Sequence, residues 1–165
     1  MLQPVVRRTW APRGQTPIHY SWDRHDRISV IGALTLSPNT QRMGVYFTYQ
    51  YENVRTENVM FFLKQLHRQL RRNLILVCDR WSVHRSAVRR LQEKHAWLQA
   101  EWLPPYAPDL NPVEAMWSYT KHGDLANYIP DDISDLENAV LDSLAQQHYD
   151  QRLKQAYFRR AGLTL

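Results

Sequence analysis

Cysteine is almost absent from this sequence, since Cys78 is the only one among 165 residues. A single thiol excludes disulfide bonds within the chain and any zinc cluster built on cysteines. No apolar run approaches the roughly 20 residues that a membrane-spanning helix needs. Residues 1–10 carry arginines but no apolar segment after them, so we expect no signal peptide there. These absences favour a protein of the reducing cytoplasm that has no membrane partner.

Several sequence motifs are also missing. The chain has no Walker-type loop, no Gly-x-Gly-x-x-Gly loop and no Gly-x-Ser-x-Gly elbow, which argues against nucleotide cofactors and serine hydrolases. What is present is a globular balance of 44% hydrophobic and 22% charged residues. We expect residues 1–165 to form a single domain. The net charge of +5 and the pI near 9.5 favour a polyanionic partner.

The order of the expected elements indicates an α/β fold. Strands rich in β-branched and aromatic residues are predicted at 15–22, 27–36 and 44–51, as an antiparallel meander. Apolar residues then recur with helical spacing from Val59 to Leu70, with Thr56 as the expected N-cap. A strand at 73–79, apolar on both faces, predicts helices on both sides. A helix at 84–95 and a strand at 100–103 are expected next. Three further helices are expected: one that begins at Asn111, one at 133–144, and one at 151–160 that stops at Gly162.

A meander followed by α-β-α-β-α is the order of a ribonuclease H-like mixed sheet, although the general rules of strand connection also allow other α/β sheets. Two acids stand out within this order. Asp79 directly follows the apolar strand, and Glu114 opens a helix 35 positions later. Two carboxylates at one end of a sheet can hold divalent metal ions for phosphodiester chemistry.

Each candidate residue also has a purely structural interpretation. Asp79 can simply end its strand. Glu114 can complete a capping box, with Asn111 as N-cap and Pro112 at the first helical position. His84 either lies near the acids or caps the helix that follows it.

Three runs of sequence resemble one known family. They are 8–17 (Arg-Thr-Trp-Ala-Pro-Arg-Gly-Gln-Thr-Pro), Asp79 with His84, and 103–117 (Leu-Pro-Pro-Tyr…Leu-Asn-Pro-Val-Glu…Trp). In order and spacing they are similar to the bacterial insertion-sequence branch of the mariner-like DDE transposases. The resemblance implies a ribonuclease H-like catalytic domain that cuts DNA with water and joins the 3′ hydroxyl to a target strand. It also implies that Asp79 and Glu114 are the second and third catalytic ligands of a Mg²⁺ or Mn²⁺ pair.

The chain departs from that family in three places. The family's first catalytic Asp lies on a strand before the Trp-Ala-Pro-Arg-Gly segment, whereas residues 1–8 hold no acid. The helix-turn-helix region that precedes that strand in the family is also expected to be missing. Arg80 follows Asp79 where many relatives have Asn. Asp23 and Asp26 are conceivable substitute acids, but their sequence context is that of a turn.

Three hypotheses follow. The first is a DNA transposase domain, which is compatible with a homodimer and contacts DNA through Trp10, Arg13, His84, Arg85 and Lys121. The second is an inactive remnant that binds DNA weakly or pairs with a full-length protein. The third is a ribonuclease H-like nuclease of other purpose. The reading frame upstream of Met1 distinguishes the first two, because an acid-ended strand there indicates a fragment of an active enzyme and a stop codon indicates a remnant.

Overall fold

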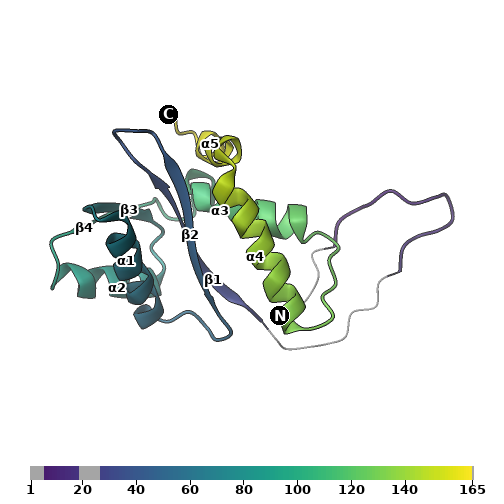
Figure 1. The fold of residues 1–165 in the computed structure, drawn as a ribbon, viewed down its shortest axis with the longest axis horizontal. Coiled ribbons are helices and arrows are strands. Elements are labelled where there is room, and N and C mark those ends of the chain that lie inside the picture. The colour runs from purple at the N-terminus through teal and green to yellow at the C-terminus, as the bar shows by residue number, and fades with distance from the viewer. Residues whose placement is uncertain (1–5, 19–26, 165) are drawn as a thin grey trace.

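The structure is a computed structural model that describes residues 6–18 and 27–164. It contains two pairs of strands and five α-helices among these residues (Figure 1). In chain order the elements are β1 (Ser29–Leu36), β2 (Met43–Gln50), α1 (Thr56–Leu70), β3 (Leu74–Cys78), α2 (Ser82–Gln92), β4 (Leu98–Trp102), α3 (Pro112–Tyr119), α4 (Ile133–Tyr149) and α5 (Gln151–Arg160). No helix in these ranges is long and apolar enough to cross a membrane.

Strands β1 and β2 form an antiparallel hairpin, as predicted, in a register that runs from Ser29 opposite Gln50 to Leu36 opposite Met43. The strand predicted at 15–22 is not confirmed: residues 15–18 form no strand, and residues 19–26 lie outside the described part of the chain. The predicted meander is therefore represented by two strands.

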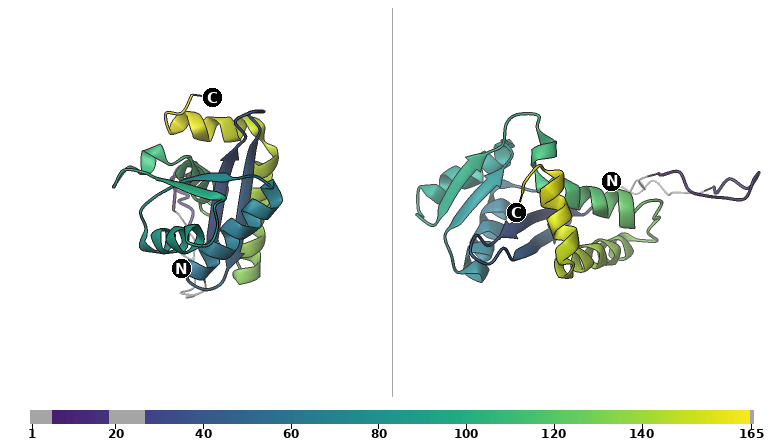
Figure 2. Two further views of the ribbon diagram at one scale, coloured as in Figure 1. Left: turned by 90° about the vertical axis from the view of Figure 1, so that its left-hand side faces the viewer. Right: turned by 90° about the horizontal axis from the view of Figure 1, so that it is seen from above.

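Strands β3 and β4 pair in parallel, with Leu74 opposite Leu98 and Cys78 opposite Trp102. Within the described residues no hydrogen-bonded ladder joins this pair to the β1–β2 hairpin. The prediction that helices cover both faces of β3 is wrong, since Ile75 and Val77 are 69% and 55% exposed. Leu74 and Leu76 face the helices α1 and α2, whereas α3, α4 and α5 pack on the hairpin instead (Figures 1 and 2).

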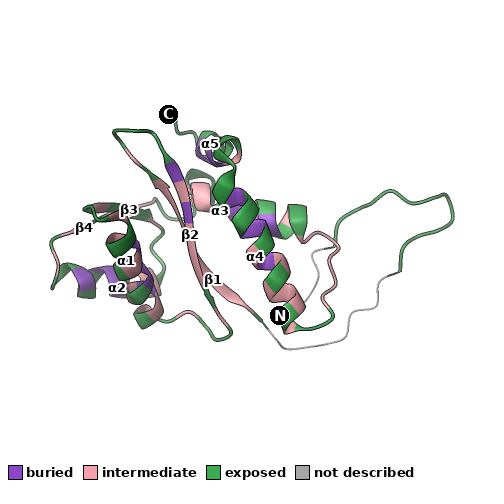
Figure 3. Cartoon of the chain, in the orientation of Figure 1, coloured by how far each residue is buried: buried purple, intermediate pink, exposed green. Residues whose placement is uncertain are grey.

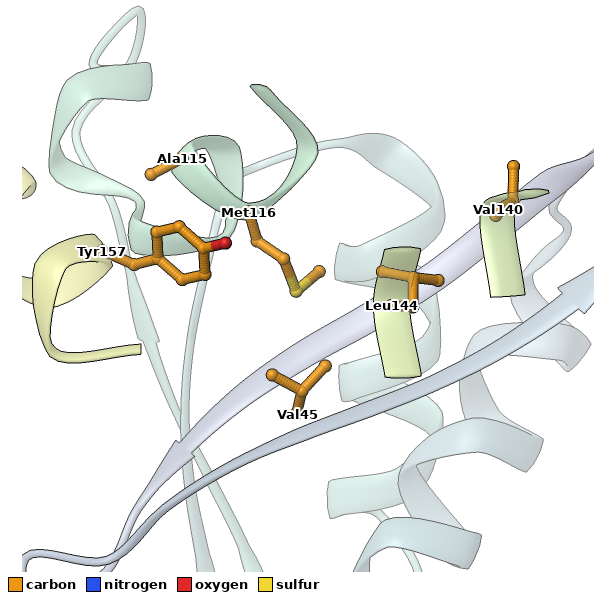
Figure 4. Close-up of a cluster of buried hydrophobic side chains, with 6 residues drawn as sticks. All are labelled: Val45, Ala115, Met116, Val140, Leu144 and Tyr157. Atoms are coloured by element: carbon orange, nitrogen blue, oxygen red, sulfur yellow. The ribbon is translucent and has the colours of Figure 1, made fainter. Parts of the chain in front are cut away.

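Alternation along β1 explains how the hairpin separates two cores. Val30 and Leu34 pack against one buried cluster, and Ile31 and Ala33 pack against the other, because successive side chains of a strand point to opposite faces. The first cluster joins β2, α3, α4 and α5 through Val45, Ala115, Met116, Val140, Leu144 and Tyr157 (Figure 4). The second joins α1, α2 and β4 through Val59, Phe62, Leu63, Ala87, Leu91 and Leu98. Buried segments accordingly line the inner sides of the helices (Figure 3).

The helix ends are partly as predicted. Helix α5 has the predicted bounds, and Gly162 follows it with a φ of 75°, a left-handed conformation that suits glycine. The N-cap of α1 is Arg55 rather than Thr56. Asn58 supplies the polar atom there, since its Oδ1 accepts a hydrogen bond from the Arg55 backbone N–H at 2.8 Å.

Gly32 sets how closely α3 approaches β1. A Cβ atom at this position would lie 2.8 Å from both Met116 Cε and Trp117 Cζ2, so these two side chains would have to move to admit it. The absence of a side chain therefore lets the first turns of α3 lie directly on the strand. Because Glu114 is on those turns, this contact also positions Glu114.

Candidate active site

Asp79 is the first residue after β3, and its side chain is fixed by two hydrogen bonds. Its Oδ1 atom accepts a bond from the backbone N–H of Trp81 at 3.0 Å and lies 2.7 Å from Nδ1 of His84. A carboxylate oxygen only accepts, so Nδ1 of His84 carries the proton in this contact. Both bonds reach the same oxygen. Within the described residues, Oδ2 of Asp79 has no hydrogen-bond partner and remains available to a ligand.

His84 therefore lies at the acid, as one of the two sequence interpretations predicted. The N-cap of α2 is Trp81, and His84 is in the first turn of that helix. The side chains of His84 and Asp79 are 27% and 53% exposed, so the pair is accessible from solvent. Burial, followed by the charge of Asp79, raises the pKa of the neighbouring Cys78 thiol to about 11, so this thiol stays protonated at neutral pH.

Trp81 is a site residue that the sequence analysis did not single out. Its ring meets the His84 ring edge-on, with centroids 5.1 Å apart and planes at 84°. The Trp81 side chain is 46% exposed although it is large and apolar. An aromatic residue two positions after a strand-ending acid was the available signal, because the backbone N–H of Trp81 bonds Asp79 while its ring lies against His84.

The loop that carries the Pro-Pro-Tyr sequence starts beside Asp79. The backbone N–H of Leu103, just after β4, donates to the carbonyl of Cys78 at 2.9 Å, so both chain segments leave the same end of the β3–β4 pair. Tyr106 is fully exposed and has a φ of 56°, a left-handed conformation that few non-glycine residues adopt. A short 3-10 turn, Pro108–Leu110, then delivers the chain to α3.

Glu114 lies on the first turn of α3 and is exposed. Asn111 is the N-cap, as predicted, and its Oδ1 accepts from the N–H of Val113 at 3.2 Å. The predicted capping box is not formed. The Asn111 N–H that Glu114 would have bonded donates instead to the carbonyl of Pro108 at 3.0 Å. The carboxylate of Glu114 is thus not used to start the helix.

The remaining candidate residues lie on three separate segments of the chain. Trp10 is 98% exposed, and Arg13 lies in the same extended segment, residues 6–18, which leads away from the helices and strands (Figure 1). Arg85 is exposed on α2, next to His84 in sequence. Lys121 is exposed in a π-helical segment, Thr120–Asp124, that follows α3 and interrupts its α-helical register. Asp23 and Asp26 lie outside the described residues.

The donor chemistry around Asp79 suits a divalent cation only in part. Asp79 and Glu114 are exposed carboxylates, and carboxylate oxygens are the ligands that Mg²⁺ and Mn²⁺ prefer. Within residues 6–18 and 27–164, no group of three or more His, Cys, Asp or Glu side chains is arranged to hold a metal ion. The described residues therefore include the two acids that the sequence predicts as metal ligands.

Known proteins share the fold of this chain. Two crystal structures have the same fold: the Mos1 strand transfer complex, with a TM-score of 0.54, and the Mos1 mariner paired end complex with Mn, with a TM-score of 0.59. Each is 18% identical in sequence, and the alignments cover 96% and 97% of this chain but 50% and 48% of the Mos1 chains. The chain thus spans about half the length of these proteins, and their likeness confirms the ribonuclease H-like α/β fold.

No curated protein sequence matches the chain significantly. The family model described as DDE superfamily endonuclease matches residues 1–137, which is most of the chain and includes both candidate acids. The chain belongs to the DDE superfamily of endonucleases.

Proposed function

We propose that this chain is the catalytic domain of a DNA transposase, which cuts DNA strands and joins their 3′ hydroxyl ends to a target with the help of divalent metal ions. The observation that carries the proposal is the placement of Asp79. It follows β3 directly, keeps Oδ2 free and lies at the end of the strand pair from which the β4 loop leads to Glu114. Membership of the DDE superfamily and the fold support this assignment.

Asp79 and Glu114 are the residues that would hold Mg²⁺ or Mn²⁺. When bound, such ions neutralise phosphate charge and activate the attacking oxygen in phosphoryl transfer. The protein's contribution is position. His84 and the Trp81 N–H restrain one oxygen of Asp79 and thereby orient the other. The contact of α3 with Gly32 fixes the helix that presents Glu114.

DNA is the partner that the charge of the chain favours. With a net charge of +5, the protein attracts phosphates without reading sequence. Arg13, Arg85 and Lys121 are exposed cations suited to phosphate contacts, and the exposed ring of Trp10 offers a surface on which a base can stack. We expect the affinity for DNA to fall steeply as salt rises, with little discrimination between sequences.

Thermal melts with and without Mn²⁺ test the metal site. A ligand that binds only the folded state raises the melting temperature. We expect Mn²⁺ to raise that of the parent protein modestly, and to have no such effect on Asp79→Asn or Glu114→Gln. Asp142→Asn, which removes an exposed carboxylate of α4, is the matched control and should respond like the parent. If Mn²⁺ stabilises Asp79→Asn as much as the parent, the catalytic assignment of Asp79 is wrong.

One observation favours the second function, an inactive remnant. The described residues contain no cluster of three metal-ligating side chains, whereas the family uses three acids. We therefore expect residues 1–165 alone to cut no DNA. A plasmid-nicking assay with Mn²⁺ separates the two functions. If the parent protein nicks DNA and Asp79→Asn does not, the chain is an active nuclease that uses a further acid, and the assignment as an inactive remnant is wrong.

A further inference from the structure

A second concentration of positive charge surrounds a hollow at the end of α1, away from the candidate acids. The hollow has a volume of about 530 Å³. Its lining residues come from α1 and from the segment before β4, and they are Lys64, His67, Arg68, Arg71, His95 and Trp97. We call it the α1–β4 hollow. No carboxylate of the described chain lines it.

The hollow and Asp79 lie at opposite ends of the β3–β4 pair. Arg71 precedes β3 and Trp97 precedes β4, whereas Asp79 and Leu103 follow these strands. Both strands run in the same direction and have five residues, which corresponds to about 17 Å of length. The α1–β4 hollow is therefore a site separate from the acids.

Stacked aromatic rings form one wall of the hollow. The rings of His67 and Trp97 lie 4.3 Å apart and are tilted by only 7°, and the His95 ring is 5.7 Å from Trp97. Trp97 also packs against the buried cluster of α1 and α2. A hydrogen-bond contact of 2.9 Å between Nδ1 of His67 and the carbonyl of Arg72 restrains the His67 ring. Packing of Trp97 and this contact of His67 thus fix the positions of the two stacked rings.

The cations around this wall are not neutralised within the described chain. Among the described residues the ion pairs are His84 with Asp79 and Arg90 with Glu57. Lys64, Arg68 and Arg71 therefore take part in no ion pair of this part of the chain. Arg68 donates only to the amide oxygen of Gln65 at 3.2 Å. Arg71 has a φ of 53° at the C-cap of α1, a position where glycine is favoured.

Stabilisation of the helix end explains only part of this arrangement. Positive charges in the last turn of a helix interact favourably with its dipole, which accounts for His67 and Arg68. Lys64 precedes that turn and Arg71 follows it. The dipole also gives no reason for a hollow with a stacked aromatic wall, whereas a phosphate-bearing ligand gives a reason for both the cations and the flat rings.

We propose that the α1–β4 hollow binds backbone phosphates of DNA and forms a contact surface separate from the acids. The naming of DNA as the source of the phosphates rests on the proposed function; the binding of phosphate rests on the hollow itself. Lys64 contacts the phosphates through its ammonium group, and Arg68 and Arg71 contact them through guanidinium groups that can each donate two hydrogen bonds. The contacts are independent of sequence, because phosphate groups are the same at every base pair.

Fluorescence anisotropy with a labelled duplex at several salt concentrations tests the inference. The test variant combines Lys64→Ala, Arg68→Ala and Arg71→Ala. The matched control combines Arg152→Ala, Arg159→Ala and Arg160→Ala, which removes the same charge from exposed positions of α5. We expect the test variant to bind at least about tenfold more weakly and its salt slope to fall by roughly two to three, and the control to change much less.

Equal losses in both variants, or no loss in the test variant, overturn the inference while leaving DNA binding intact. If the test variant does not fold, as judged by its melting curve, Arg68→Gln alone should lower the slope by about one, and an unchanged slope overturns the inference. Competition by inorganic phosphate that displaces the duplex at equal concentration identifies a small phosphate ligand and overturns the assignment to DNA. A parent protein that binds no duplex contradicts the proposed function instead, and titration of that protein with inorganic phosphate then decides whether the hollow binds phosphate.

Discussion

Nδ1 of His84 lies 2.7 Å from Oδ1 of Asp79, and no other side chain or backbone group of residues 6–18 and 27–164 bonds the second oxygen of this carboxylate. His84, in the first turn of α2, thus restrains the side chain of Asp79, the residue that follows β3. In metal sites, a partner that hydrogen-bonds a ligand fixes the direction of its free lone pairs.

Replacement of His84 should therefore weaken metal binding without abolishing it. We expect His84→Ala to lower the affinity for Mn²⁺ by roughly tenfold, because the carboxylate of Asp79 then rotates more freely. Isothermal titration calorimetry measures the change. His84→Gln, which retains a donor, should recover part of the affinity. An affinity equal to that of the parent in His84→Ala would show that the bond has no role in orienting Asp79.

The contact between β1 and α3 predicts a large effect from a small substitution. In Gly32→Ala, the added methyl group meets Met116 and Trp117 at 2.8 Å. We expect a loss of about 1–3 kcal/mol in the free energy of unfolding, as is typical of overpacking. Denaturant unfolding measures it. Gly123→Ala is the control, since a Cβ there meets nothing within 4 Å, and equal stability of the two variants would refute the close approach of α3.

Two tyrosines that bond Glu137 should make stability depend on pH. Tyr49 donates to Oε1 of Glu137 at 2.6 Å, and Tyr51 donates to Oε2. The bonds from Tyr49 and then Tyr51 lower the pKa of Glu137 below its ordinary value. Because the folded pKa is lowered, the stabilisation is present above the unfolded pKa of about 4.3 and is lost as the pH falls through the folded value.

The double variant Tyr49→Phe, Tyr51→Phe should therefore melt below the parent at neutral pH, and the difference should shrink as the pH falls below about 4. Melting curves over a range of pH measure the difference. Tyr149→Phe, which replaces an exposed tyrosine of α4, is the control and should melt like the parent at each pH. A difference that does not change with pH would show that the bonds to Glu137 contribute nothing.

The segment 6–18 should contribute to DNA binding through Arg13 and Trp10. Arg13→Ala should reduce the slope of the logarithm of affinity against the logarithm of salt by about one, since one phosphate contact is lost. Trp10→Ala should weaken binding with little change in the slope, because stacking does not release counterions. Anisotropy titrations measure both. Identical slopes for Arg13→Ala and the parent would remove Arg13 from the DNA-binding residues.

Much of the fold was predictable because it depends on local patterns. The α1 stripe of Val59, Phe62, Leu63 and Leu66 is buried as its spacing predicted, and α5 has the predicted bounds. The exposure of Ile75 and Val77 was not predictable, since an apolar strand indicates burial but not which helices supply it. The packing of α3 on β1 depends on Gly32, 84 positions before Met116, and no local pattern connects them.

At the candidate site, the nearness of His84 to Asp79 was predictable from the sequence, but the individual hydrogen bonds were not. Asp79 and His84 were recognised from their positions, and their hydrogen bond follows from the turn between them. The role of Glu114 in a capping box was a sound inference from Asn111 and Pro112, but the backbone N–H of Asn111 donates within the preceding 3-10 turn. The α1–β4 hollow was not predictable from the sequence, because its residues come from two segments that meet only in the folded chain.

Asp79 and Glu114 are proposed to serve one metal site. An anomalous difference map from crystals grown with Mn²⁺ tests it directly. We predict a peak that both carboxylates contact, with the two groups within roughly 4–8 Å of each other, as in two-metal sites. Carboxylates on opposite faces of the sheet, or a peak that contacts neither, would contradict the claim and leave Glu114 as an exposed residue of the first turn of α3.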